Sequence, residues 1–319
     1  MTIKVPKHFT RFKCIAEKCR DNCCIGWKIV IDDELNGKYG NLGGKLGERL
    51  KKSIVYDEGT PIFKLDSCGR CPMLNERGLC DIITERGEEY LCEICREHPR
   101  YYNVLADYCE GGIGIACEVG AKLVLAADDD EFTEITADFG SYDAEYDEAL
   151  ADTITVRDEL LSRCAPNTRF DEQGLLDLAA KLDEKYGFGD DRCEVIDPLD
   201  AVEALANLTP FNEEFTHNLE SAKEVCGSAD ELINGGGRVY FMRLLRYFIR
   251  RHFINSVDMR NPLATLRMCI ASAKAIFAIC LAHTDEKEID LPLLTECAKN
   301  YSKSVEYNTD NTYDLIDLV

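Results

Sequence analysis

The chain has 319 residues, of which 45% are apolar and 30% are charged, and its formal net charge is −22. This length and apolar content are sufficient for a buried core within one or two domains. The negative charge argues against binding to nucleic acids or to anionic membranes, because both repel an acidic surface.

The chain opens with Met1–Pro6, which lacks the apolar core of a signal peptide. No run of 18 uninterrupted apolar residues occurs, so the sequence predicts no membrane span. We therefore expect a cytoplasmic protein.

The first third of the chain is rich in turns and has short predicted elements. Asp32 or Asp33 is a good N-cap for a helix that starts near Glu34. A Gly-rich stretch follows this helix, and Pro99 should end a later one. The predicted elements are a strand over 27–31 and helices from 34, over 45–55, over 87–98 and over 117–127.

An acidic linker, Asp128–Glu131, separates this region from a longer one with helical periodicity. Residues 1–120 contain 18 basic and 19 acidic side chains, whereas most of the negative charge lies beyond them. A weak strand signal covers 133–137. The predicted helices cover 143–163, 172–186, 198–207, 212–226, 238–254, 262–283 and 291–302.

These elements predict a mainly α fold, with an irregular cysteine-rich metal-binding N-terminal module (1–127) packed on an acidic helical region (128–319). The acidic region could attract a lysine-bearing protein, although solubility is the simpler reason for its charge.

Cysteine is unusually frequent, with 17 in the chain and 11 of them at or before position 117. Cytosolic thiols are kept reduced, so this clustering favours metal binding over disulfides. The six later cysteines are single and are predicted to be small core residues. They are Cys164, Cys193, Cys226, Cys269, Cys280 and Cys297.

One early pattern has the spacing of a zinc ribbon. It is Cys68-x2-Cys71-x20-Cys92-x2-Cys95, which would supply four thiolates to one zinc ion. Residues Cys14, Cys19, Cys23 and Cys24 form an earlier group. The adjacent Cys23 and Cys24 should point in different directions, so either they serve different centres or only one of them is a ligand.

Other residues of this region have both a functional and a plain interpretation. Arg96 could offset thiolate charge or form a surface salt bridge, and His98 before Pro99 is more typical of a structural residue than of a ligand. Gly26 suits a tight turn. Trp27, the only tryptophan, is best explained by core packing.

Two features beyond the cysteines concern ligand binding. The closely spaced glycines of 110–114 lack a preceding strand signal and a complete Gly-x-Gly-x-x-Gly, so they are weak support for a nucleotide loop. Five arginines of helix 238–254 interleave with aromatic residues. We interpret this segment as a core helix whose arginines pair with acidic groups. The alternative is that the arginines bind an anion such as the carboxylate of S-adenosylmethionine.

The motif string as a whole resembles the flagellin lysine-N-methylases. The similar stretches include the paired cysteines that lead into Gly26 and Trp27, and a Cys-Pro-Met-Leu-Asn segment. They lie, in the family's order, at 12–14, 19–27, 64–66, 71–82, 87–91, 95–100 and 117.

The resemblance implies an enzyme that moves a methyl group from S-adenosylmethionine to lysine side chains of flagellin. It also implies a metal centre, which would be an iron–sulfur cluster of the [4Fe–4S] type, with zinc as the alternative. Neither the sequence nor the resemblance identifies a catalytic base or the cofactor-binding residues. By position, the family's metal ligands fall on Cys14, Cys19, Cys23, Cys24, Cys71, Cys80, Cys95 and Cys117. This set omits Cys68, Cys92 and Cys109, so it disagrees with the zinc ribbon.

A non-enzymatic zinc- or iron-binding module is the main alternative, because shorter metal-chelating proteins share several of these elements. It would act as a metal chaperone, a scaffold or an electron carrier.

Overall fold

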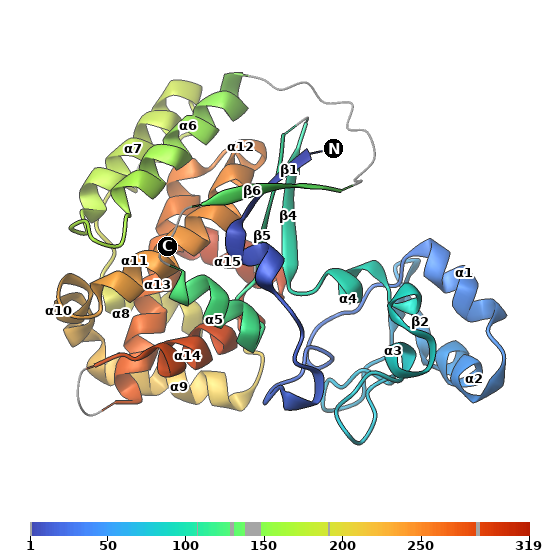
Figure 1. The fold of residues 1–319 in the computed structure, drawn as a ribbon. Coiled ribbons are helices and arrows are strands. Elements are labelled where there is room, and N and C mark those ends of the chain that lie inside the picture. Colours follow the sequence, from blue (N-terminus) through green and yellow to red (C-terminus); the bar gives the residue numbers. More distant parts are fainter. Residues whose placement is uncertain (1, 107, 128–130, 138–147, 191, 285–287) are drawn as a thin grey trace. The chain divides into compact units, whose positions relative to one another are not determined.

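A computed structural model describes residues 2–106, 108–127, 131–137, 148–190, 192–284 and 288–319 (Figure 1). Contacts divide the chain into two compact units. We name Lys13–Arg100 with Cys117–Val119 the cysteine unit, and Met1–Phe12 with Tyr101–Ala116 and Gly120–Val319 the helical unit. The two units alternate along the chain, so contacts do not divide it at a single point near residue 127.

The cysteine unit consists of short elements joined by turns. Its first long helix is capped as predicted, because the Asp32 carboxylate accepts a hydrogen bond from the Leu35 amide at 3.0 Å. The elements are η2 (Ala16–Lys18), α1 (Asp33–Asn41), α2 (Gly44–Ser53), β2 (Ile54–Asp57), β3 (Thr60–Phe63), α3 (Asp81–Arg86), η3 (Glu88–Tyr90) and α4 (Glu93–Glu97).

Two predictions for this unit are wrong in detail. Segment 27–31 does not form a strand but meets β3 only through an isolated bridge, between Val30 and Ile62. The helix predicted over 87–98 is divided into η3 and α4. The division follows from the extended backbone of Leu91, whose φ and ψ are −80° and 136°, whereas Gly87, whose φ is +88°, lies before η3 and ends α3. Helix α4 does end before Pro99, as the sequence predicts.

The helical unit contains a four-stranded sheet in the order β4-β5-β1-β6 (Figure 1). Strand β1 is parallel to β5 and antiparallel to β6, with Lys4 opposite Glu110. Only β6 was predicted. The strands are β1 (Thr2–Pro6), β4 (Arg100–Leu105), β5 (Tyr108–Ile113) and β6 (Phe132–Thr136), and η1 (Lys7–Arg11) follows β1.

The predicted helices of this unit agree closely with the observed ones, and the mainly α prediction is confirmed. The helices over Ala229–Asn234, Ser256–Met259 and Thr309–Leu318 were not predicted. Residues 128–130 of the predicted linker and 143–147 of the first long helix lie outside the described residues. The helices are α5 (Glu118–Ala126), α6 (Glu148–Arg163), α7 (Glu172–Tyr186), α8 (Pro198–Ala206), α9 (Glu213–Val225), η4 (Cys226–Ser228), α10 (Ala229–Asn234), α11 (Arg238–His252), η5 (Phe253–Asn255), α12 (Ser256–Met259), α13 (Pro262–Ala282), α14 (Leu291–Ser304) and α15 (Thr309–Leu318).

Helix α13 is the centre of the helical unit, where it packs against α7, α8, α9, α11 and α14 (Figure 1). Within the described residues it alone is long and apolar enough to cross a membrane, but 94% of its most apolar window is buried inside the protein. Its Lys274 is 1% exposed and pairs with Glu172 at 2.7 Å. A buried, internally paired helix of this kind is typical of a protein core.

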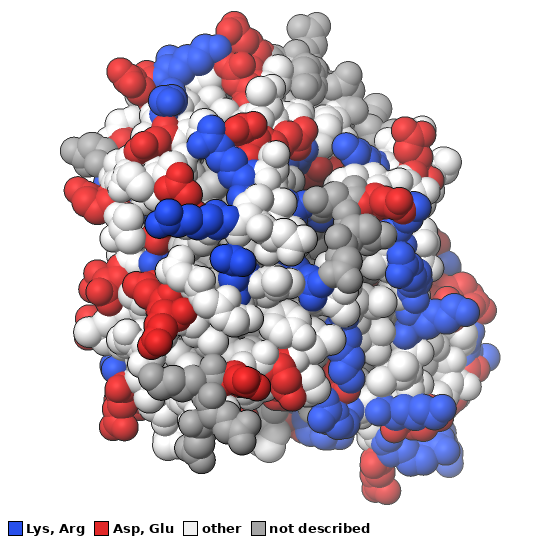
Figure 2. Space-filling view, turned by 60° about the vertical axis from the view of Figure 1, so that its left-hand side comes forward, with Lys and Arg blue, Asp and Glu red and all other residues white. Residues whose placement is uncertain are grey.

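The later cysteines mostly lie in this core, as predicted. Cys193 is the exception, since it is only partly buried. On the face of the molecule in Figure 2, acidic and basic side chains are interspersed rather than gathered in one acidic patch.

Candidate metal centre

The thiols of the cysteine unit are part of its apolar core. Cys71 and Cys92 are buried among a small set of apolar residues, and Cys24, Cys80 and Cys95 pack against the same set. The core residues besides these cysteines include Ile29, Ile31, Leu35, Tyr39, Leu46, Leu50, Phe63, Met73, Ile82 and Leu91. Short turns therefore bring sulfur atoms from three separate stretches of sequence into one interior.

Backbone contacts connect these stretches. The Cys71 amide donates to the Cys24 carbonyl at 2.8 Å, and the Cys95 amide donates to the Cys92 carbonyl at 3.0 Å. Helix α4 is tied to the start of α1, because the second Asp32 carboxylate oxygen accepts from the Glu93 amide at 3.0 Å. These bonds fix the backbone from which the thiols project.

The thiols also interact with one another. A hydrogen bond with Cys23, together with burial and the nearby Cys80 and Cys71, raises the pKa of Cys24. A hydrogen bond with Cys92, burial and the nearby Cys24 and Cys71 raise the pKa of Cys95.

The pKa shifts of the other thiols in this core also arise from burial and from neighbouring thiols. Burial raises the pKa of Cys71 to about 11, and burial also raises that of Cys80, with Cys23 nearby. Cys92 instead has a lowered pKa, because the Cys95 thiol donates to it and, despite burial, the Tyr39 hydroxyl adds a further contact 3.7 Å from its sulfur. We call these six residues the central thiols: Cys23, Cys24, Cys71, Cys80, Cys92 and Cys95.

The central thiols have the chemistry of a metal ligand set. Several thiolates cannot coexist in a buried space without a compensating positive charge, and a thiophilic metal supplies that charge. Their side chains are not in coordination geometry, because no three or more Cys, His, Asp or Glu residues of the described chain are placed to hold a metal ion. Thiols are the donor type that a thiophilic metal prefers, and metal binding by these residues remains a prediction.

A second group of cysteines lies beside Glu118, whose side chain is 5% exposed. Arg20 reaches this carboxylate with its side chain at 3.1 Å, which brings the Cys19 segment next to the residue after Cys117. Burial raises the pKa of Cys19, and Glu118 and Cys14 add to the shift. Of the eight ligands implied by the family resemblance, five are central thiols, and Cys14, Cys19 and Cys117 belong to this second group.

The zinc-ribbon set is not brought together as a whole. Cys68 is exposed in a turn, where its amide donates to the Asp66 carboxylate at 2.8 Å, whereas the other three residues of that set are central thiols. The ligand set implied by the family resemblance does not include Cys92, whereas the zinc-ribbon spacing Cys92-x2-Cys95 does. Cys109 lies in β5 of the helical unit.

Other predicted residues have structural roles. Gly26 has φ of +90° and its amide donates to Gly69, as a tight turn requires. The Trp27 indole donates to the Cys23 carbonyl at 2.5 Å and its ring lies 5.7 Å from that of His98. Arg96 forms the surface salt bridge with Glu97, at 3.4 Å.

Sequence reasoning did not single out Arg49. Its guanidinium pairs with Asp81 at 2.5 Å, and its charge lowers the pKa of Cys71 against the larger effect of burial. It is a resident cation beside the central thiols, and only the folded arrangement of α2 and α3 reveals it.

Comparison with known proteins supports the resemblance. The chain is 30% identical over 135 residues to a lysine-N-methylase of Salmonella typhimurium (strain LT2) and 29% identical to one of Salmonella choleraesuis; each match covers 39% of this chain and 33% of the relative. It is 28% identical to the flagellar biosynthetic protein FliU of Salmonella muenchen, over 39% of this chain and 78% of that protein.

The match thus spans about a third of the length of the two methylases. No family model matches the chain, and no solved structure matches it. The resemblance predicted from the sequence is confirmed at this level: part of the chain is similar to the lysine-N-methylases.

Proposed function

We propose that this protein is a lysine N-methyltransferase that transfers a methyl group from S-adenosylmethionine to lysine side chains of flagellin or of another protein. The observation that carries the proposal is the similarity to two proteins named lysine-N-methylase and to a flagellar biosynthetic protein. The gathering of thiols in the cysteine unit supports it, because the same resemblance predicted most of those residues as ligands.

The transfer forms a bond between the lysine nitrogen and the methyl carbon and breaks the bond between that carbon and the sulfonium sulfur. The products are methyllysine, S-adenosylhomocysteine and one proton. Lysine is protonated at neutral pH, with an ordinary pKa of about 10.4, so a basic group must accept a proton before attack. The chain's net charge of −22 favours the approach of a lysine-bearing surface.

The central thiols are the residues that we propose hold an iron–sulfur cluster, with zinc as the alternative. Such a centre would supply positive charge that lets the thiols ionise and would cross-link the turns that carry them. Tyr39 and Arg49 would then act as neighbours that donate to sulfur or offset its charge.

A metal-binding module without methyltransferase activity is the second candidate. It is favoured by the extent of the match, which covers only 33% of each methylase, so the shared part corresponds to one portion of a longer protein. This candidate retains the central thiols and makes no use of S-adenosylmethionine.

Two assays on the full chain, purified without oxygen, separate the candidates. In the first, the protein is incubated with flagellin and methyl-labelled S-adenosylmethionine, and label on lysine is measured by mass spectrometry. In the second, iron, zinc and acid-labile sulfide are quantified. Label that is lost in a Cys71→Ser variant supports the methyltransferase, whereas bound metal without label on flagellin or other lysine-bearing proteins supports the module.

A further inference from the structure

We infer that the helical unit has a binding site for a nucleoside, which it recognises by the ribose hydroxyls and the flat base. The site is a hollow of about 330 Å³, at the lower end of the range for small-molecule sites. Binding there requires neither methyl transfer nor metal, so the inference goes beyond the proposed function. The hollow is lined by the four strands of the sheet and by α6 and α11, through residues that include Pro6, Tyr101, Phe132, Asp158, Leu161 and Ser162.

One ion pair fixes a wall of the hollow and is not available to a ligand. Both carboxylate oxygens of Glu110 accept from Arg157, at 2.6 and 2.7 Å, and one of them also accepts from the Tyr108 hydroxyl at 2.8 Å. Arg157 donates in addition to the Oδ1 atom of Asp158, with Nη2 at 2.9 Å and Nε at 3.1 Å. These bonds hold Asp158 at the hollow and occupy only one of its two oxygens.

Three polar groups of the lining make no hydrogen bond with any described residue. They are the Oδ2 atom of Asp158, the Ser162 hydroxyl and the Tyr101 hydroxyl. Asp158 and Ser162 are four positions apart on α6, so their side chains lie on the same face of that helix. Tyr101 belongs to β4 of the sheet. One acceptor and two hydroxyls that can donate or accept suit a ligand that itself has hydroxyl groups.

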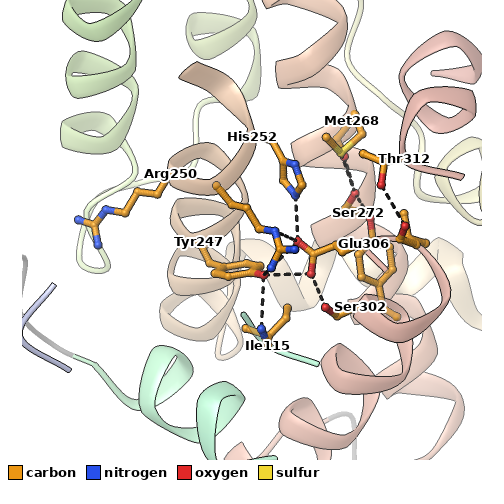
Figure 3. Close-up of polar contacts among 12 residues, drawn as sticks. Ile115, Tyr247, Arg250, His252, Met268, Ser272, Ser302, Glu306 and Thr312 are labelled. Carbon is orange, nitrogen blue, oxygen red and sulfur yellow. Dashed lines mark hydrogen bonds and ion pairs between the residues drawn. The ribbon is translucent and has the colours of Figure 1, made fainter. Parts of the chain in front are cut away.

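Tyr101 differs in this respect from Tyr247, whose ring centre lies 6.4 Å from its own. The Tyr247 hydroxyl donates to Glu306 at 3.0 Å, as Figure 3 shows, and accepts from Arg251 at 2.8 Å. Arg251 also pairs with Glu306 at 3.0 Å, so the predicted pairing of arginines with acidic groups is confirmed for this residue of α11. Burial raises the pKa of Tyr101, so its hydroxyl stays protonated and can donate to a ligand.

The glycines of 110–114 contribute to the site without forming a nucleotide loop. They lie in or beside strand β5, where a Cβ atom on Gly112 would be 2.3 Å from the Tyr101 hydroxyl. Glycine is therefore what lets the Tyr101 ring lie against the strand and form a wall of the hollow.

The open polar groups and the apolar part of the lining together favour a nucleoside. A carboxylate that accepts from a ribose hydroxyl is a recurring element of nucleotide sites, and Asp158 offers one oxygen for it. Pro6, Phe132 and Leu161 supply apolar surface for a flat base. Lys4 and three arginines line the hollow as well, but an uncharged ligand does not need their charge. The nucleoside is either free or the adenosyl group of S-adenosylmethionine.

Calorimetric titration of the full chain tests the inference with adenosine, 2′-deoxyadenosine and S-adenosylhomocysteine. We expect adenosine to bind, and 2′-deoxyadenosine, which lacks one ribose hydroxyl, to bind at least about tenfold more weakly. The double variant Tyr101→Phe/Asp158→Asn should weaken adenosine binding to a similar extent, because asparagine keeps an oxygen for Arg157 but replaces the open carboxylate oxygen by a donor. S-adenosylhomocysteine that binds more tightly than adenosine would identify the co-substrate as the ligand, whereas equal affinity would identify a free nucleoside, and both results support the site.

The control is Tyr313→Phe/Asp314→Asn, which makes the same two changes at exposed positions of α15 and should bind as the wild type does. Far-ultraviolet circular dichroism checks that each variant is folded, and Ser162→Ala, at an exposed position, is a second variant of the site that should also bind more weakly. The inference is overturned if neither adenosine nor S-adenosylhomocysteine binds at millimolar concentration, if 2′-deoxyadenosine binds as well as adenosine, or if the site variants keep wild-type affinity. A chain that binds adenosine but leaves lysine unlabelled would contradict the proposed function alone.

Discussion

The two units of this protein are stabilised in different ways. In the helical unit, α13 is buried on nearly all sides and is surrounded by other helices, so apolar contact alone can hold its fold. The cysteine unit has about 90 residues but only a small apolar core, and two of the buried members of that core are cysteines. A unit with a small apolar core gains less stability from burial, and the thiolate–metal bonds that we propose would be a second source.

Removing metal should therefore have the largest effect, and only on the cysteine unit. We expect a chelator, or the variant Cys71→Ser/Cys95→Ser, to release metal and to cost the cysteine unit on the order of 10 kcal/mol. Hydrogen exchange followed by mass spectrometry should show loss of protection in α1 to α4, while α13 stays protected.

Cys68→Ser is the matched control, because this thiol is exposed and makes no hydrogen bond with the described residues. It should retain metal and protection. Retention of metal by Cys71→Ser/Cys95→Ser would contradict the assignment of the central thiols. Loss of metal in Cys68→Ser would instead favour the zinc-ribbon ligand set, to which Cys68 belongs.

A substitution in the helical core should have the next largest effect and should spare the cysteine unit. Phe277 on α13 is fully buried and packs edge-on against Phe241, with ring centres 5.3 Å apart. Phe277→Ala should destabilise the helical unit by about 3–5 kcal/mol through the cavity that it leaves. Chemical denaturation followed by circular dichroism measures this cost.

Leu199→Ala, at a position that is 38% exposed, is the control and should change stability by less than about 0.5 kcal/mol. Metal content should be the same in both variants and in the wild type. A parallel loss of metal in Phe277→Ala would show that the two units unfold together, and the comparison between them would fail.

The same contrast explains what the sequence could predict. Helices such as α7 and α13 repeat apolar residues at local spacing, so their predicted bounds agree with the structure to within a residue. Strand β1 pairs with β5 and β6, more than 100 positions away, and no local pattern signals such partners.

In the cysteine unit, spacing alone identified cysteines but not their grouping. Cys92 and Cys95 were predicted from the spacing Cys92-x2-Cys95, and both are central thiols. The ion pair between Arg20 and Glu118, which joins residues 98 positions apart, brings the Cys19 segment next to the residue after Cys117. The fold of the intervening chain determines this proximity, so sequence motifs could not predict it.

The smallest predicted effect concerns pH and is confined to the helical unit. Asp183 is 2% exposed, and burial raises its pKa from 3.8 to about 6, with a contribution from Asp190, although the carboxylate accepts from the Leu263 amide at 2.7 Å. An acid with a raised pKa is more protonated when folded, so its contribution to stability falls as pH rises from about 4 to 6. Asp183→Asn should gain stability relative to the wild type over that interval, on the order of 2 kcal/mol. Thermal unfolding at pH 4, 5, 6 and 7 measures the difference.

Glu306 provides the opposite slope in the same unit. Burial opposes its ionisation, but the charges of Arg251 and His252 dominate and lower its pKa. Its contribution is present above the ordinary pKa of glutamate and is lost as pH falls below it, so Glu306→Gln should lose stability relative to the wild type as pH rises. Opposite slopes for the two variants would assign this pH response to buried carboxylates, whereas equal slopes would contradict both assignments. Because neither residue contacts the central thiols, metal content should not change in either variant.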